Sequence, residues 1–325
     1  MIESIEFKNF KALRDTTLPL SRFTLIVGPN GSGKSTALQA FSALNNPSQP
    51  QFFQCRSAGV PNSTPVILTA KWKEEGNNYT VTVQWTNNGI YGPAYSPDAR
   101  FSTVLARTRL FALDANAAAA PVLLQPNLEL APNGANLAGV LDQLRDQDPE
   151  RFEGLNEQVG RWIPEFDQVL FETPQQGHRS IALRTRKGGH RIGANQLSQG
   201  TLIALALLTI ARLPEPPSIV CLEEPDRGLH PRLLRDVRDA LYRLAYPDGA
   251  QEKREPVQVI ATTHNPYFLD LFREHPEEIV IAEKVGLDAT FSRLSDRKDL
   301  EEILGDAPLS EVWYSGVLGG VPAGT

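Results

Sequence analysis

The chain has 325 residues, 41% of them hydrophobic, and a formal net charge of −6. This length allows one large or two ordinary domains, and this composition is typical of a packed globular core. The negative net charge excludes a uniformly basic, nucleic-acid-coating surface, although a local basic groove or one formed only in a dimer remains open. The only cysteines, Cys55 and Cys221, exclude a disulfide framework and a cysteine-based zinc site.

The N-terminal region predicts strands that lead into a phosphate-binding loop. Residues 2–7 alternate apolar and polar side chains, and residues 18–20 and 23–27 continue as apolar strand segments. A helix is expected over residues 35–44. Between the last strand and this helix, the pattern Gly-x4-Gly-Lys-Ser/Thr is fitted by Gly28, Pro29, Asn30, Gly31, Ser32, Gly33, Lys34, Ser35 and Thr36.

This loop has the chemistry of a triphosphate site. Successive backbone N–H groups and a helix N-terminus converge on one anion in such a strand–loop–helix arrangement. We expect Lys34 to reach the β- and γ-phosphates of ATP and Ser35 to ligate Mg²⁺. The alternative is a glycine-rich turn with no ligand, which the flanking strand and helix disfavour.

The middle of the chain predicts a separate subdomain. Residues 45–65 are rich in Pro, Asn, Gln and Ser and indicate a loop. Residues 66–72 and 79–85 predict a hairpin, residues 101–113 a further strand, and residues 115–132 are ambiguous. Helices are expected over residues 134–147 and 149–163, the second capped by Asp148, and strands over 169–171 and 180–186.

One basic cluster lies near the end of this region, and it comprises Arg179, Arg184, Arg186, Lys187, His190 and Arg191. Charge runs usually form a solvated surface, so an exposed hairpin is the favoured interpretation. Contact with a polyanion is the alternative.

The C-terminal third returns to alternating strands and helices. Helices are expected over residues 199–213, 231–245 and 266–272, and strands over 219–222, 257–262 and 279–282, the last strand predicted. The fold class predicted is α/β, with a mixed or parallel sheet covered by helices on both faces and an inserted α+β subdomain. The expected boundaries are 1–60 and 195–290 for the two parts of the core, 61–194 for the insertion, and 291–325 for a C-terminal tail.

Two strand ends carry candidate catalytic residues. Glu223 and Glu224 follow an apolar strand, where ligands bind in parallel sheets, so Glu223 is expected to hold Mg²⁺ and Glu224 to deprotonate water. His264 ends the next strand and is placed to donate to a γ-phosphate oxygen. The alternatives are two exposed acids that cap a strand and a structural histidine; His230, before a helix, is the weaker candidate.

Ser198 and Gly200 open the most apolar helix. A serine in this position is most simply an N-cap, yet a Ser/Gly turn at a helix N-terminus is also an anion site. Such a turn need not lie over the phosphates bound by its own subunit.

The order of these motifs resembles the head of an ABC-type ATPase: phosphate loop, Leu-Ser-x-Gly, a strand with Glu-Glu-Pro, then Thr-His. The opening residues 5–11 and the Gly-Leu-His-Pro at 228–231 look like the RecF/SMC/OLD branch. The tail, including Trp313, Gly316 and Pro322, resembles the stand-alone predicted ATPases of that branch. No coiled-coil arm is indicated, and the roughly 40 residues after Ala282 are too few for a TOPRIM domain.

The resemblance implies that Gly28 to Thr36 bind ATP, that Ser35 and Glu223 serve Mg²⁺, and that Glu224 is the catalytic base. It also implies that His264 contacts the γ-phosphate, and that Ser198 and Gly200 act on ATP held by a partner subunit. Residues 226–228 would then form a dimer-interface loop. Thr201 and Glu223 depart from the usual residues, and the glutamine that senses Mg²⁺ is not placed, with Gln54 the candidate beside Gln49 and Gln51.

The function that follows is an ATP-hydrolysing homodimeric switch that acts on DNA or on a separate effector, for example a nuclease-like protein, in DNA repair or anti-phage defence. The alternatives are the energising subunit of a membrane transporter and a non-hydrolytic ATP sensor. The N-terminus lacks the regions of a signal peptide, and no apolar stretch reaches ~18 residues, so a cytoplasmic protein with no membrane partner is expected.

Overall fold

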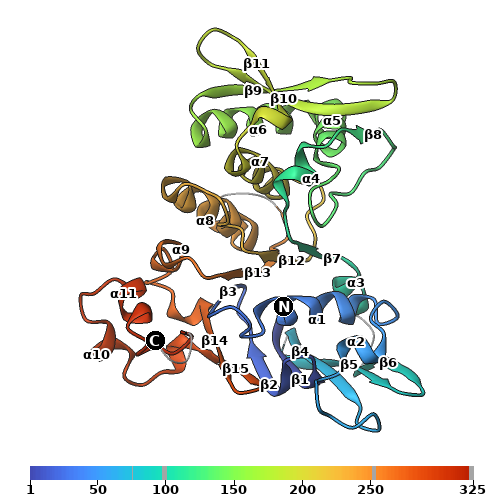
Figure 1. Ribbon diagram of the computed structural model, residues 1–325, viewed down its shortest axis with the longest axis vertical. Coiled ribbons are helices and arrows are strands. Elements are labelled where there is room, and N and C mark those ends of the chain that lie inside the picture. The colour runs from blue at the N-terminus through green and yellow to red at the C-terminus, as the bar shows by residue number, and fades with distance from the viewer. Residues whose placement is uncertain (75, 97–100, 251–253, 322–325) are drawn as a thin grey trace. The chain divides into compact units, whose positions relative to one another are not determined.

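The computed structural model describes residues 1–74, 76–96, 101–250 and 254–321 (Figure 1). The chain divides into two compact units. Unit 1 comprises Met1–Leu110, Pro217–Glu224 and Glu255–Thr325, and unit 2 comprises Phe111–Pro216 and Pro225–Arg254. Each unit is therefore built from segments far apart in the sequence.

A six-stranded mixed sheet, with the order β15-β14-β3-β13-β12-β7, forms the α/β part of unit 1. Its centre is parallel: β3 (Phe23–Val27) lies between β13 (Gln258–Thr263) and β14 (Ile279–Val285), and β12 (Ile219–Glu223) pairs with β13. All residues of β3 and β13 are buried, which explains their continuous apolar runs. The remaining members are the antiparallel β15 (Asp288–Arg293) and the edge strand β7 (Thr108–Phe111).

Unit 1 also contains a five-stranded antiparallel sheet, with the order β2-β1-β4-β5-β6. In it, β1 (Ile2–Phe10) pairs with β4 (Val66–Glu74), opposing Phe7 to Leu68. Alternate residues of β5 (Asn77–Thr86) are buried, and Trp85 packs against Phe10. The other strands are β2 (Leu13–Pro19) and β6 (Gly89–Ser96).

Short helices complete unit 1, and two contacts attach the tail. Ser310 donates from its backbone N and its Oγ to the carboxylate of Asp270, at 2.7 and 2.6 Å, and Arg273 donates to the carbonyls of Gly305 and Ala307. The helices are α1 (Lys34–Asn45), α2 (Phe52–Cys55), α3 (Phe101–Ala106), α9 (Pro266–Asp270), α10 (Leu300–Leu304) and α11 (Leu309–Tyr314), with single turns η3 (Pro276–Glu278) and η4 (Leu294–Asp296).

Unit 2 packs helices beside a small sheet. Its central helix, α7 (Gln199–Ala211), is buried continuously from Thr201 to Ile210 and contacts α4 (Ala115–Ala119), α6 (Pro149–Trp162) and α8 (Pro231–Ala245). The sheet pairs β10 (His178–Thr185) with β9, β11 and β8. The remaining elements are α5 (Leu137–Gln147), β8 (Val122–Leu123), β9 (Phe166–Glu172), β11 (Arg191–Gly193), η1 (Ala194–Gln196) and η2 (Pro247–Ala250).

The predicted fold class is confirmed, and most predicted elements are present with ends shifted by a few residues. The strand expected over residues 101–113 is wrong in its first half, because Phe101 and Leu105 lie four apart and both face the core from α3. The strand at 279–282 is not the last, since Gly286, with φ 62°, turns the chain into β15. The sequence analysis also omits β6 and the short α2.

The division into units differs from the boundaries expected at 60 and 194. The hairpin of β4 and β5 belongs to unit 1 because β4 pairs with β1, whereas α7 and α8 belong to unit 2. One residue named above, Pro322, lies outside the described residues.

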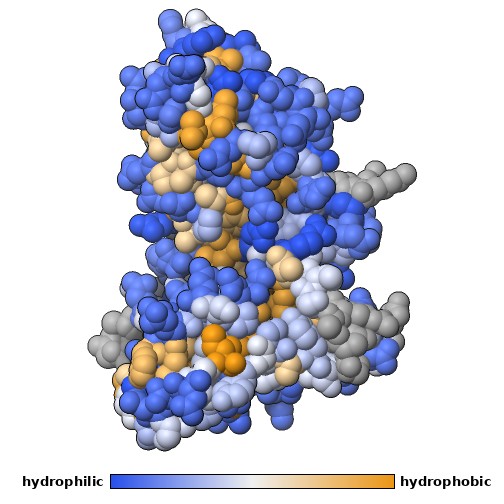
Figure 2. All heavy atoms as spheres, turned by 90° about the vertical axis from the view of Figure 1, so that its right-hand side faces the viewer, coloured by the Kyte–Doolittle hydropathy of each residue, from blue (hydrophilic) through white to orange (hydrophobic). Residues whose placement is uncertain are grey.

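The surface drawn in Figure 2 is mostly hydrophilic, with apolar residues gathered in separate patches. Among the described residues, no helix combines the length and the apolar character needed to cross a bilayer. Even α7, the most apolar helix expected from the sequence, has only 13 residues.

Candidate nucleotide site

Three chain segments meet at one edge of the parallel sheet in unit 1. The strand β13 lies between β3 and β12, with Thr263 opposite Val27 and Thr262 opposite Glu223. The phosphate loop follows β3, the two acids end β12, and His264 follows β13. Because the carboxyl ends of parallel strands share one edge, the predicted nucleotide residues of unit 1 come together there.

The loop backbone has the conformation that its glycines allow. Gly31 and Gly33 have φ values of 78° and 92°, in the left-handed region, and Gly33 is the N-cap of α1. A Cβ on Gly28 would meet the carbonyl oxygen of Ala282 at 2.3 Å, so only glycine fits against β14. The side chains of Ser32 and Lys34 are buried, and Ser32 Oγ has no hydrogen-bond partner among the described residues.

Lys34 lies over the loop that precedes it. Its Nζ donates to the carbonyl oxygens of Gly28 and Pro29, at 2.7 and 2.9 Å. Burial lowers the pKa of Lys34, and the carboxylates of Glu224 and Glu223 oppose that change. The ammonium group is thus held between the loop and the two acids, where a phosphate chain would need a counter-charge.

Ser35 and Glu223 meet as the motif requires. Ser35 Oγ donates to Oε1 of Glu223, which brings the first residues of α1 and the end of β12 together. A hydroxyl and a carboxylate are hard oxygen ligands of the kind that Mg²⁺ takes beside substrate phosphates and water. The described residues contain no cluster of three or more His, Cys, Asp or Glu.

Glu224 and His264 form a second pair beside the first. His264 Nδ1 lies 2.8 Å from Glu224 Oε1, and since a carboxylate accepts, Nδ1 carries the proton. Glu224 adopts a φ of 46°, and its backbone N donates to Thr262 Oγ1 at 3.2 Å. Thr262 is a residue that the motif analysis left without a role, although its position opposite Glu223 in a neighbouring strand is the signal that could have found it.

Ser198 and Gly200 lie in unit 2 and have structural roles there. Ser198 is the N-cap of α7, since its Oγ accepts from Thr201 N at 3.1 Å. A Cβ on Gly200 would lie 2.6 Å from the carbonyl oxygen of Gly228, so this glycine lets α7 approach the loop after the acids. His230, the weaker candidate, caps α8 by accepting from Arg232 N.

Gln54, the candidate for the missing glutamine, lies in α2. Its side chain accepts from Gln51 N at 3.2 Å in a capping box. The residues of this short helix thus satisfy one another, and the position of a Mg²⁺-sensing glutamine stays a prediction.

Known families and proteins match the chain across both halves of the motif set. Residues 1–88 match a family model described as "AAA ATPase domain", and residues 124–270 match one described as "AAA domain, putative AbiEii toxin, Type IV TA system". The chain is 24% identical over 332 residues to the OLD nuclease of Thermus scotoductus. This alignment covers 84% of this chain and 60% of the nuclease. It is 28% identical over 131 residues to structural maintenance of chromosomes protein 1 of Caenorhabditis elegans, 34% of this chain and 10% of that protein.

The fold has a solved counterpart in the SMC head domain from Thermotoga maritima. The two superpose with a TM-score of 0.52 at 18% identity, over 90% of this chain and 98% of that domain. The chain therefore has an ABC-type P-loop ATPase fold. Its sequence is similar to AAA-type ATPase domains, to an OLD nuclease and to an SMC protein, and it spans about 60% of the length of that curated OLD relative.

Proposed function

We propose that this chain hydrolyses ATP with Mg²⁺ in a homodimer whose closing and opening acts on DNA or on a partner effector. The observation that carries the proposal is the pairing of His264 with Glu224, next to the pairing of Ser35 with Glu223. The group proposed to activate water and the pair proposed to hold Mg²⁺ thus belong to the same sheet edge.

Each group has one task in the proposed reaction. Lys34 and the N–H groups of the loop hold the β- and γ-phosphates, and Ser35 with Glu223 would hold Mg²⁺, which neutralises phosphate charge when bound. Glu224 accepts the proton of the attacking water, and the Nδ1–H of His264 orients its carboxylate. The Nε2 of His264 faces away from that bond and is the atom proposed to meet a γ-phosphate oxygen.

The dimer completes the site. In the proposal, Ser198 and the N-terminus of α7 from one subunit meet the γ-phosphate bound by the other. ATP then favours the closed dimer because it gains contacts there that ADP cannot make, which makes hydrolysis a switch. The target follows from the names of the relatives, a nuclease and a chromosome-maintenance protein, which both point to nucleic acid.

Turnover by Glu224→Gln tests the catalytic assignment. Removal of the base is expected to lower kcat by about 10²- to 10⁴-fold, while ATP binding is retained because the loop is unchanged. Glu302→Gln, an exposed acid on α10, is the matched control and should keep wild-type turnover. Equal rates for the wild type and Glu224→Gln would overturn the assignment.

The proposed contact between Ser198 of one subunit and the ATP bound by the other is tested separately, in the Glu224→Gln variant. With ATP and Mg²⁺ this variant is expected to elute as a dimer in size-exclusion chromatography. Adding Ser198→Asp keeps an N-cap acceptor of equal quality but places a negative charge against the γ-phosphate, so the dimer should dissociate while the thermal unfolding temperature stays unchanged. A dimer that persists in Ser198→Asp contradicts the proposed contact.

A further inference from the structure

Unit 2 contains a cavity of about 730 Å³, and of the residues that line it only Ser198 has a role in the proposed ATPase reaction. Its apolar walls come from Pro164 and Phe166 around the start of β9, from Ile192 in β11 and from Leu197 directly after η1. Of these residues Phe166 is buried, Ile192 and Leu197 are half-buried, and Pro164 is exposed. This size and lining are typical of a small-molecule site.

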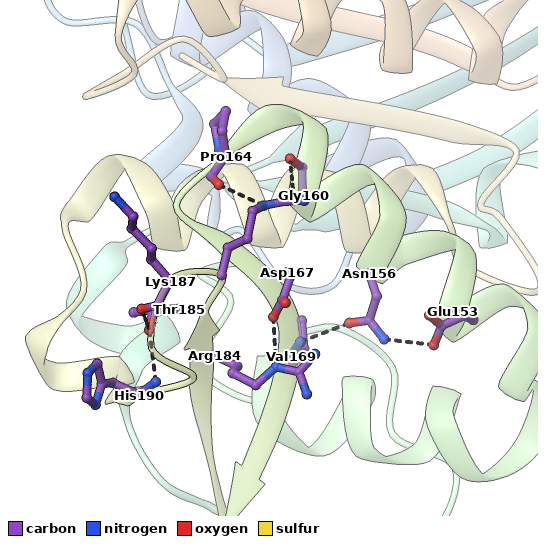
Figure 3. Close-up of polar contacts among 11 residues, drawn as sticks. Glu153, Asn156, Gly160, Pro164, Asp167, Val169, Arg184, Thr185, Lys187 and His190 are labelled. Atoms are coloured by element: carbon purple, nitrogen blue, oxygen red, sulfur yellow. Dashed lines mark hydrogen bonds and ion pairs between the residues drawn. The ribbon is translucent and has the colours of Figure 1, made fainter.

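Arg186, at the mouth of the cavity, is fixed in place by the end of α6. Its Nε donates to the carbonyl oxygen of Pro164 and its Nη2 to that of Gly160, both at 3.1 Å (Figure 3). Its backbone N donates to the carbonyl oxygen of Glu165 at 2.8 Å. The guanidinium therefore holds a fixed position without an acidic partner in these contacts, and its charge remains available to an anion.

Lys187 is the second cation of the mouth. The turn that carries it is shaped by Thr185, whose Oγ1 donates to Lys187 O at 3.0 Å and accepts from His190 N at 2.9 Å. The side chain of Lys187 extends away from this turn in Figure 3. Among the described residues, no hydrogen bond or ion pair is found for the Lys187 ammonium group. By contrast, Arg184 on the same hairpin is paired with Asp167 at 2.8 Å.

The charges at the mouth of the cavity indicate the charge of the anion that it would bind. Arg186 and Lys187 supply two positive charges to the lining and Glu165 one negative charge, and this balance matches a single anionic group. Thr185, Gln196 and Ser198 add neutral hydrogen-bonding groups to the same lining. The apolar walls need a ring or another compact apolar body behind the charged group.

We propose that this cavity binds a small amphiphilic anion, namely a flat apolar ring system that bears one phosphate, sulfonate or carboxylate group. The ring lies against Phe166, Ile192 and Leu197, and the anionic group meets Lys187 and Arg186. The residues that form this site all belong to unit 2 of one subunit.

Fluorescence of 8-anilinonaphthalene-1-sulfonate tests the proposal with the full chain, because this probe combines an apolar ring system with one anion. The wild type is expected to bind it at one site with enhanced fluorescence. Lys187→Glu should weaken binding about tenfold, as loss of one charged hydrogen bond does. Ile192→Trp places a bulkier side chain in the apolar wall, where the ring of the probe would lie, and should reduce the enhanced signal.

Arg191→Glu is the matched control, since Arg191 is an exposed cation on the same hairpin but does not line the cavity. It should change the affinity by less than about twofold. An equal loss in Arg191→Glu and Lys187→Glu would mean diffuse attraction to the hairpin and would overturn the proposal. Unchanged binding by Ile192→Trp would place the probe elsewhere and would also overturn it.

Competition defines the ligand chemistry. Phenyl phosphate should displace the probe, whereas inorganic phosphate and benzyl alcohol, which each lack one half of the required chemistry, should not do so at the same concentration. Displacement by oligothymidylate with no effect of phenyl phosphate would assign the surface to a nucleic-acid strand and reject the small-molecule site. Lys187→Glu alters only an exposed side chain, so its result stands even if Ile192→Trp fails to fold.

Discussion

Glu224 adopts a backbone conformation that side chains rarely take. Its φ of 46° lies in the left-handed region, and such residues cost roughly 1–3 kcal/mol unless their surroundings hold them. Here the hydroxyl of Thr262 accepts from Glu224 N, and His264 contacts the carboxylate. The strained residue is therefore the one to which the proposed chemistry is assigned, and its neighbours fix both ends of it.

Thr262→Val tests whether this anchoring matters for turnover. Valine keeps the shape of the buried side chain but removes the acceptor for Glu224 N, so the carboxylate is expected to lose its fixed position. We expect kcat to fall about tenfold with little change in KM, the pattern of a lost transition-state contact. The measurement is steady-state ATP hydrolysis over a range of ATP concentrations.

The control for this variant is Thr209→Val in α7. Thr209 is also fully buried, and its Oγ1 donates to Leu205 O at 2.8 Å, remote in sequence from the strand ends. Thr209→Val should lower the free energy of unfolding by about as much as Thr262→Val does, without lowering kcat. A loss of kcat that is equal in both variants would show a general effect of stability rather than positioning of Glu224.

Gly200 has a steric reason to be glycine that is independent of ATP. We expect Gly200→Ala to lower the free energy of unfolding by about 1–3 kcal/mol, because its Cβ would lie 2.6 Å from the carbonyl oxygen of Gly228 and the backbone would have to move. Gly249→Ala, where a Cβ meets nothing within 4 Å, should change it by less than about 0.5 kcal/mol. Urea unfolding of both variants measures the difference, and equal stability would contradict the tight approach.

At the scale of secondary-structure elements, α5 is held to β10 by one buried carboxylate. Asp142 Oδ1 lies 3.0 Å from both Arg145 Nη2 and Arg179 Nε, and its side chain is only 7% exposed. Removing Asp142 takes away the acidic partner of Arg179, whereas Arg145 keeps its ion pair with Asp146 at 2.7 Å. We expect Asp142→Ala to destabilise the chain by about 3 kcal/mol in urea unfolding.

Asp167→Ala is the matched control, because it breaks the more exposed ion pair with Arg184 on the same strand pair. Such pairs contribute roughly 0–1 kcal/mol. If the free energy of unfolding falls equally in Asp142→Ala and Asp167→Ala, the burial of Asp142 does not strengthen its ion pairs. The packing of α5 on β10 must then depend on apolar contacts alone.

The elements that were predicted correctly from the sequence are those whose motifs and capping residues lie within the element itself. The phosphate loop is one contiguous motif, and α8 has Pro231 at its first turn, a histidine cap and an amphipathic face, so its bounds are matched. The missed elements lack such signals. The strand β6 is exposed along most of its length and contains Gly89, Gly92 and Pro93, residues that usually mark turns.

At the scale of the whole chain, the division into units depends on pairings that no local pattern contains. The strand β1 pairs with β4 across the phosphate loop and α1, and β3 lies between two strands from the C-terminal third. The motif order predicted that the nucleotide residues would share a sheet edge, because the rule for parallel strands is general. It could not predict that β4 and β5 remain with unit 1, since a hairpin pattern does not identify the strand beside it.

The cavity of unit 2 and the proposed dimer share one residue, Ser198, and this predicts regulation. A ligand in the cavity would lie against the serine that is proposed to meet the partner's ATP, so it is expected to lower ATP turnover. With phenyl phosphate at the dissociation constant found by probe displacement, turnover should be about half of its original value. In Lys187→Glu the same inhibition should need about ten times more phenyl phosphate.

Inhibition that is equally strong in the wild type and Lys187→Glu would place phenyl phosphate at the phosphate loop and contradict the coupling, while probe binding to the cavity would still stand. Benzyl alcohol controls for effects of the ring alone. If phenyl phosphate displaces the probe but turnover does not change, the cavity is a binding site and Ser198 is not engaged during the rate-limiting step. The two readouts thus separate the ligand site from the dimer, because one needs only unit 2 and the other needs ATP bound across two subunits.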